Sequence, residues 1–187
     1  VQGGHTEHES ERLPEGSRRH MSECQLRDAT SRDAPSIAAI YNPFITDTVV
    51  TFEEQTVSAD QMEERLTRLQ EQGLPWRVIE RDGRVLGYAY AGLWRARAAY
   101  RFVAESAIYL SEAARGQGLG TTLYQDLFEQ LRARGMRMVM GVIALPHPAS
   151  VAFHERLGFE RQGVFPQVGY KFDRWIDVGY WQLDLTR

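Results

Sequence analysis

The sequence contains a single cysteine, Cys24, among 187 residues, so no disulfide can form within the chain. It has no apolar run near the roughly 20 residues that a membrane-spanning helix needs, and no stretch patterned like a secretory signal. Neither charge predominates, because 22 Lys and Arg stand against 25 Asp and Glu for a formal net charge of −3. These absences give no support for binding to nucleic acid or to a membrane. They predict a cytoplasmic protein.

The first 20 residues differ in composition from the rest. They are rich in Glu, Arg, His, Gly and Ser, and Leu13 is their only large aliphatic residue besides Val1. Such a stretch buries too little apolar surface to offset the entropy lost on ordering. We therefore predict that residues 1–20 are a mobile or expression-derived leader. Residues 21–187, which begin at Met21, are predicted to form a single domain.

A glycine-rich run, Arg-Gly-Gln-Gly-Leu-Gly at residues 115–120, lies between an apolar segment (106–110) and an amphipathic helical pattern (121–134). The glycines allow a sharp turn and close approach of a ligand to the backbone. The free N–H groups and the positive dipole end of the following helix favour an anion. The run is neither a Walker loop nor a dinucleotide fingerprint, because the residues after Gly120 and the glycine spacing are wrong for these. It predicts a pyrophosphate site, and the alternative is a helix start that needs glycines only for packing.

Strand and helix patterns alternate along the rest of the chain. The expected strands are 25–29, 76–80, 85–93, 104–110, 138–143, 161–170 and 178–185, with a short β-branched and aromatic stretch at 49–52. The expected helices are 33–41, 58–72, 118–134 and 148–157. Asp82 and Gly83 predict a hairpin turn between the second and third strands. The pattern indicates a mixed α/β fold.

Three segments, taken together, resemble the GCN5-related N-acetyltransferase (GNAT) family. Arg115, Gly118 and Gly120 match its Arg/Gln-x-x-Gly-x-Gly/Ala loop. Residues 141–144 resemble the strand after that loop's helix, and residues 152–159 resemble its Ala-x-x-Leu-Tyr-Glu-Lys-x-Gly-Phe segment. Within the family, the closest resemblance is to phosphinothricin (methionine sulfoximine) N-acetyltransferases. It is carried by residues 51–53, 94–100, 104–106, 154–155, 172 and 178–184.

This resemblance implies an α/β GNAT fold: a mixed, twisted central sheet with two splayed parallel strands and helices on both faces. It implies acetyl-CoA as co-substrate between those strands (105–110 and 138–143), no metal, and a homodimer. The implied acetyl-CoA contacts are Ile108, Tyr109, Leu110, Arg115, Gly116, Gln117, Gly118, Leu119, Gly120, Thr121, His147, Ser150 and Phe153. His147 departs from the family pattern, which usually has Asn at this place.

Acetyl transfer to an amine requires a base for the amine, donors for the oxyanion and a proton for the thiolate. Glu105 is the candidate base, and its alternatives are a strand-end cap or an arginine partner. His154 takes the place of the family's Tyr, and is a candidate acid or base. Its alternative is a core histidine satisfied by packing or by a backbone carbonyl.

The acceptor, implied to be a small amino acid, carries a carboxylate and a second polar group. Arginine suits both because its fork bonds two oxygens, so Arg97 and then Arg95 are the leading candidates, with solvated surface charge as the alternative. The other predicted lining residues are Phe52 and Tyr100, with Lys171 and Trp175 as weaker candidates. Tyr180 and Trp181 are predicted to be sheet core.

The sequence thus predicts an N-acetyltransferase that acts by direct attack of a small-molecule amine. Two alternatives remain open: an acetyltransferase for peptide or protein N-termini, and a non-catalytic acyl-CoA-binding module.

Overall fold

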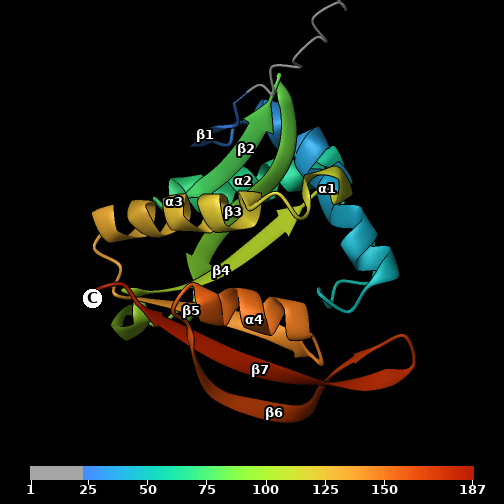
Figure 1. The fold of residues 1–187 in the computed structure, drawn as a ribbon, viewed down its shortest axis with the longest axis vertical. Helices are drawn as coiled ribbons and strands as arrows, with labels where there is room; N and C mark the ends of the chain where they lie inside the picture. Colours follow the sequence, from blue (N-terminus) through green and yellow to red (C-terminus); the bar gives the residue numbers. More distant parts are fainter. Residues whose placement is uncertain (1–22) are drawn as a thin grey trace, which may run out of the picture.

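A seven-stranded sheet in the order β1-β2-β3-β4-β5-β7-β6 forms the centre of the computed structural model, which describes residues 23–187 (Figure 1). The leader predicted at residues 1–20 lies outside the described residues. The strands are β1 (Gln25–Asp28), β2 (Trp76–Arg81), β3 (Arg84–Leu93), β4 (Val103–Leu110), β5 (Met138–Leu145), β6 (Glu160–Lys171) and β7 (Arg174–Asp184). The helices are α1 (Ala34–Asp47), α2 (Ala59–Glu71), α3 (Leu119–Ala133) and α4 (Pro148–Arg156).

The two central strands, β4 and β5, are the parallel pair of this sheet. They pair only from Val103 opposite Met138 to Ser106 opposite Gly141. Beyond that point β4 stays bonded to β3 and β5 stays bonded to β7, so the two strands diverge into a V (Figure 1). The predicted splayed pair is confirmed, and the V leaves two facing strand edges free for a ligand.

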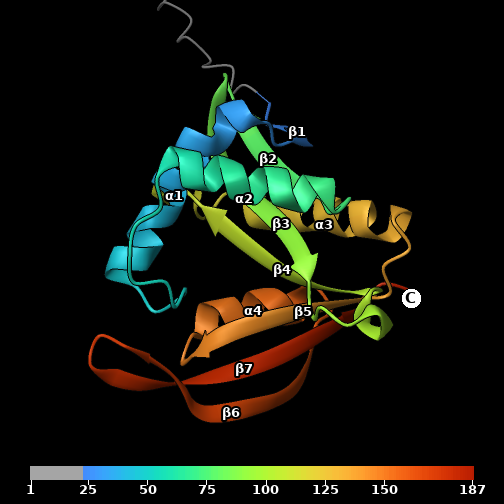
Figure 2. The same ribbon diagram turned by 180° about the vertical axis from the view of Figure 1, so that it is seen from behind.

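Helices cover both faces of the sheet (Figure 2). α3 packs on β2, β3 and β4, and its leucines at every fourth position (Leu119, Leu123, Leu127 and Leu131) are all buried. On the opposite face α1 and α2 lie against each other and bury a second cluster that includes Ile37, Met62 and Tyr88. Burial of a large apolar side chain contributes about 1.5–3 kcal/mol, so the leucine stripe fixes α3 on the sheet.

One expectation about the first third of the chain needs correction. The helix predicted over 33–41 runs on as α1 to Asp47, through Pro43. The extra turn persists because Ile45 is buried and Phe44 packs edge-on against Tyr109, with 5.1 Å between ring centroids. This packing offsets the backbone hydrogen bond that proline cannot make.

The stretch 49–52 lies in the loop between α1 and α2 and forms no strand. Threonine hydroxyls there accept backbone N–H groups that would otherwise be free to pair with another strand. The Val50 N–H donates to Thr48 Oγ1 at 3.2 Å, and the Glu53 N–H donates to Thr51 Oγ1 at 3.3 Å. Such local bonds compete with strand pairing. The remaining elements agree with the predicted segments to within a few residues, and β7 begins earlier than expected, at Arg174.

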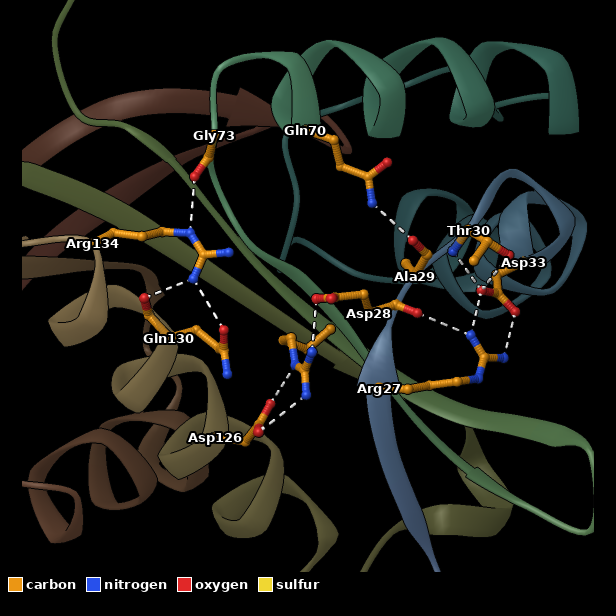
Figure 3. Close-up of polar contacts among 11 residues, drawn as sticks. Arg27, Asp28, Ala29, Thr30, Asp33, Gln70, Gly73, Asp126, Gln130 and Arg134 are labelled. Atoms are coloured by element: carbon orange, nitrogen blue, oxygen red, sulfur yellow. Dashed lines mark hydrogen bonds and ion pairs between the residues drawn. The ribbon is translucent and has the colours of Figure 1, made fainter.

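A buried arginine, Arg77 on β2, connects α3 to the sheet. Its partners Asp28 and Asp126 are labelled in Figure 3. Its Nε donates to Asp126 of α3 at 2.6 Å, and its Nη1 donates to Asp28 of β1 at 2.7 Å. Asp126 is nearly buried as well, with 15% of its side chain exposed. Removing one partner of a buried ion pair leaves the other charge uncompensated.

We expect Asp126→Ala to lower the free energy of unfolding by about 3 kcal/mol, measured by urea denaturation. Glu129→Ala is the matched control, because Glu129 is exposed on the same helix. That control should change stability by no more than about 0.5 kcal/mol. Equal effects of the two substitutions would contradict the role given to Arg77.

Candidate active site

The glycine-rich loop leads from the end of β4 into α3. Gly116 and Gly118 adopt φ values of 72° and 74°, a left-handed conformation that side chains disfavour, and Gly118 caps α3. Within residues 23–187, the backbone N–H groups of Gly116, Gln117 and Gly118 have no backbone acceptor. The first N–H groups of an α-helix also lack internal partners. The loop therefore presents a set of free donors at the positive end of the α3 dipole.

The same loop is braced from two sides. Arg81 donates to Gln117 Oε1 at 3.1 Å, and Gln117 Nε2 donates to the Ala113 carbonyl at 2.8 Å. Gly120 serves packing, because a Cβ there would lie 3.4 Å from both Leu110 and Phe153. The loop thus has the free donors expected of a pyrophosphate site. At Gly120 it also has the tight packing expected of a helix start that needs glycine for packing.

Glu105 lies at the narrow end of the V, opposite Gly92 of β3 and Met140 of β5. Its side chain reaches solvent, yet the surrounding protein raises the pKa of its carboxyl group above the ordinary value, while the charge of Arg95 acts in the opposite direction. Within residues 23–187 this carboxylate forms no hydrogen bond or ion pair. Neither structural alternative, the cap or the arginine partner, therefore accounts for it. A carboxylate in this environment is suited to accept a proton.

His154 lies on the other face of the sheet, on α4, and is 6% exposed. Its Nδ1 is 2.8 Å from the Ser150 carbonyl, so this nitrogen carries the proton and Nε2 is left as an acceptor. Burial lowers its pKa, so the ring is neutral at pH 7. It packs against Gly141, where β4 and β5 separate, and a Cβ at that position would lie 2.9 Å from His154 Cδ2. The ring is thus held in one orientation and tautomer at the narrow end of the V.

His147 caps α4. Its Nδ1 accepts the Ser150 N–H at 3.1 Å. An Asn side chain, which is a favoured N-cap, would accept an N–H of the first helical turn in the same way. The predicted contact between His147 and acetyl-CoA stays a prediction, with one ring nitrogen left for it. Ser150 joins the two histidines, because its N–H meets His147 and its carbonyl meets His154.

Ser106 and Tyr124 also lie where the strands separate, and sequence reasoning missed both. The Ser106 hydroxyl donates to the Tyr124 hydroxyl at 3.2 Å, and both residues are buried. Tyr124 follows Leu123 in the helical stripe and is easily taken for core. The available sign was Ser106 itself, a polar residue between the apolar residues of β4 that face inward.

The predicted acceptor residues come from two sides of the V. At the end of β3, the Arg95 guanidinium lies over the Trp94 ring at 4.8 Å, and Tyr100 meets the same ring edge-on. Arg97 is exposed in this segment, just before a 3-10 turn (Ala98–Tyr100).

From the other side come Phe52 and Lys171. Lys171 on β6 is only 2% exposed, and its ammonium donates to the Thr51 carbonyl at 2.8 Å. The Phe52 ring lies directly on Gly169, where any Cβ would overlap it. Lys171 therefore holds the loop between α1 and α2 against the β6–β7 hairpin. Trp175 is 63% exposed, with its ring 4.9 Å from that of Tyr170, and Trp181 is buried as expected.

A polar network behind Phe52 was also missed. The Tyr41 hydroxyl is 2.7 Å from Thr51 Oγ1 and donates to Glu53 at 2.8 Å. Arg65 of α2 binds both oxygens of Glu53, at 2.7 and 3.0 Å, and holds the pKa of that carboxyl below its ordinary value. These side chains are separated by up to 24 positions in the sequence, so no short sequence motif contains them all.

Residues 23–187 contain no cluster of three or more His, Cys, Asp or Glu suited to a metal ion. In the same part of the chain, no helix is both long and apolar enough to cross a membrane.

Comparison with known proteins identifies the family to which this chain is similar. The profile of the Acetyltransferase (GNAT) domain matches residues 26–179. A phosphinothricin N-acetyltransferase from Streptomyces viridochromogenes is 40% identical over 160 residues, covering 86% of this chain and 87% of the relative. An L-methionine sulfoximine/L-methionine sulfone acetyltransferase from Pseudomonas aeruginosa is 39% identical, covering 86% of this chain and 94% of the relative.

Among solved structures, a phosphinothricin acetyltransferase of the GNAT superfamily from Sinorhizobium meliloti, in complex with acetyl-CoA, is similar at a TM-score of 0.83. It is 41% identical, and the match covers 86% of this chain and 88% of that one. The overall fold is therefore shared with a protein whose structure contains acetyl-CoA.

Proposed function

Because the chain belongs to the GNAT acetyltransferase family, as an acetyl-CoA-dependent N-acetyltransferase, we propose that it acetylates the amino group of a small amino acid or analogue. Methionine sulfoximine, methionine sulfone and phosphinothricin are the acceptors named for its relatives. The observation that carries the proposal is Glu105, a carboxylate at the narrow end of the V with a raised pKa and no partner within residues 23–187. Such a group is free to serve an incoming ammonium.

The chain's residues divide the work. The free N–H groups of residues 116–121 hold the pyrophosphate, and the unpaired edge of β4 beyond Ser106 holds the pantetheine arm as an added strand. When bound, acetyl-CoA supplies an activated acetyl group. Glu105 removes a proton from the acceptor's ammonium, directly or through a water, so that the amine attacks the thioester carbonyl without a covalent enzyme intermediate. The carbon–sulfur bond then breaks, and CoA leaves as the thiol with the second proton that the attacking nitrogen gives up.

His154 does not act as an acid from its resting state, because its single proton is committed to the Ser150 carbonyl. Its Nε2 is an acceptor, so we assign it to proton uptake or to orientation of the reacting groups. Arg95 and Arg97 face the acceptor's carboxylate from the β3 side, where paired guanidinium donors suit two oxygens.

The test is release of free CoA thiol when the protein is mixed with acetyl-CoA and methionine sulfoximine. A panel of free amino acids, their sulfones and short peptides identifies the acceptor class. Turnover of free analogues supports the proposal, whereas turnover of peptides alone would favour an N-terminal acetyltransferase. Binding of CoA with no turnover of any acceptor would indicate a non-catalytic module.

A cytoplasmic location and a homodimer stay predictions from the sequence. The dimer prediction has a candidate surface in the large exposed side chains of β6, β7 and their turn: Phe165, Val168, Tyr170, Phe172 and Trp175. Several large exposed apolar side chains on one hairpin are typical of a surface that contacts another protein. Sedimentation of the wild type and of Trp175→Ala tests it, and a wild-type monomer at micromolar concentration would contradict it.

A further inference from the structure

An aromatic-walled pocket of about 180 Å³ lies between α2 and the sheet, on the same face as Glu105. Trp76, Tyr88 and Tyr90 form its floor as a stack of nearly parallel rings, with centroids of Trp76 and Tyr90 4.4 Å apart. Arg65, Arg68 and Leu69 of α2 form its opposite side. The volume suits a short side chain with a few heavy atoms.

The floor carries polar groups that the protein leaves unsatisfied. The Trp76 Nε1–H is fully buried and has no acceptor within residues 23–187. In the same part of the chain, no hydrogen bond affects the hydroxyls of Tyr88 and Tyr90, whose pKa values are raised by burial. Buried donors are normally paired, so the unpaired Trp76 N–H points to an oxygen supplied by a ligand.

The charges around the pocket select against cations. Arg65 is held at the mouth by Glu53, and Arg68 has no ion pair within residues 23–187. A side chain bearing an ammonium or guanidinium would meet like charge here, whereas a neutral or anionic oxygen would meet donors.

The pocket is connected with Glu105 through Gly92. Tyr90 pairs with Ala107 and Gly92 pairs with Glu105, so Tyr90 and Glu105 are diagonal neighbours on one face, roughly 7–8 Å apart. Gly92 lies between Glu105 and the pocket and carries no side chain. A Cβ there would contact only Leu69, at 3.9 Å, so the space above Gly92 is open.

We propose that this pocket receives the side chain of the amino-acid acceptor while its amino group lies at Glu105. The side chain is unbranched, bears no positive charge and ends in hydrogen-bond-accepting oxygens, as in a sulfone, sulfoximine or phosphinate. Trp76 and Tyr88 recognise those oxygens, and Gly92 is the passage. This inference rests on the proposed function, and it names the residues that determine side-chain specificity.

The experiment compares methionine sulfone with norleucine, whose side chain has the same length and no oxygen, at saturating acetyl-CoA. Tyr88→Phe and Trp76→Phe should each lower kcat/KM for the sulfone about tenfold, with less than about a twofold change for norleucine. Gly92→Val should raise KM for the sulfone about tenfold and leave KM for acetyl-CoA within about twofold. Gly163→Val is the control strand substitution, since a Cβ at Gly163 meets nothing within 4 Å.

The outcomes separate the two proposals. If the wild type acetylates neither compound nor any other free amino acid, the proposed function fails. If the wild type is active but Tyr88→Phe and Gly92→Val leave sulfone kinetics unchanged, or if both acceptors weaken equally, only the pocket's role is overturned.

Discussion

Glu105→Gln is expected to lower kcat by a factor of about 10² to 10⁴, the range by which a positioned general base accelerates a reaction. The amide keeps the shape of the side chain and cannot take a proton. The protein should fold normally, because Glu105 has no partner to lose within residues 23–187 and the substitution removes a partly desolvated charge. Steady-state thiol release, with a thermal unfolding curve as the control for folding, measures both.

The pH profile gives a second readout of the same substitution. Because burial raises the pKa of Glu105, kcat/KM of the wild type should rise with pH through a pKa above the ordinary value of a glutamate. Below that pKa the carboxyl group is protonated and cannot act as a base. Glu105→Gln should lose this limb and retain any limb due to the acceptor's own amine. An unchanged profile would transfer the base role to another group, with His154 the next candidate.

Gly118→Val is expected to raise KM for acetyl-CoA by about tenfold or more. The left-handed conformation of Gly118 costs a side-chain-bearing residue roughly 1–2 kcal/mol, and relief of that strain would turn the free N–H groups away from the pyrophosphate. A Cβ at this position meets no other atom within 4 Å, so the effect comes from backbone conformation rather than from overlap.

The matched control for this loop is again Gly163→Val, in a strand position that accepts a side chain. KM for the amino-acid acceptor should stay within about twofold in Gly118→Val, because the acceptor lies on the opposite face. If both KM values rise together, the loop has a wider structural role than holding a phosphate.

Local sequence patterns were sufficient to predict a helix or turn whose residues are close together in the chain. The leucine repeat of α3 and the Asp82–Gly83 turn were predicted from neighbouring residues alone, and so was the loop between β4 and α3. The extension of α1 through Pro43 was not, because it depends on Tyr109, which is 65 or more positions away. Propensity argued for an end at Tyr41, and packing of Ile45 and Phe44 overrode it.

Some residues of the candidate site could likewise be predicted from the sequence, and others could not. Glu105 and His154 stood out through family motifs, and the structure adds a raised pKa for Glu105 and a single tautomer for His154. The Tyr41–Glu53–Arg65 network and the pocket floored by Trp76 could not be found in advance. Their members lie on different elements, and they meet only because the sheet register and the α2 packing bring them together.

The contact between Lys171 and Thr51 has a consequence for the order in which the protein becomes competent. It joins residues 120 positions apart, so the loop between α1 and α2 is fixed only after nearly the whole chain has been made. Long-range contacts of this kind form late, because their loop-closure entropy is offset only once the intervening structure exists. The loop that we propose for the pyrophosphate lies between β4 and α3, which are near in sequence, so its contacts close a much shorter stretch of chain. A nascent or C-terminally shortened chain is therefore expected to form this loop before the wall that we propose for the acceptor.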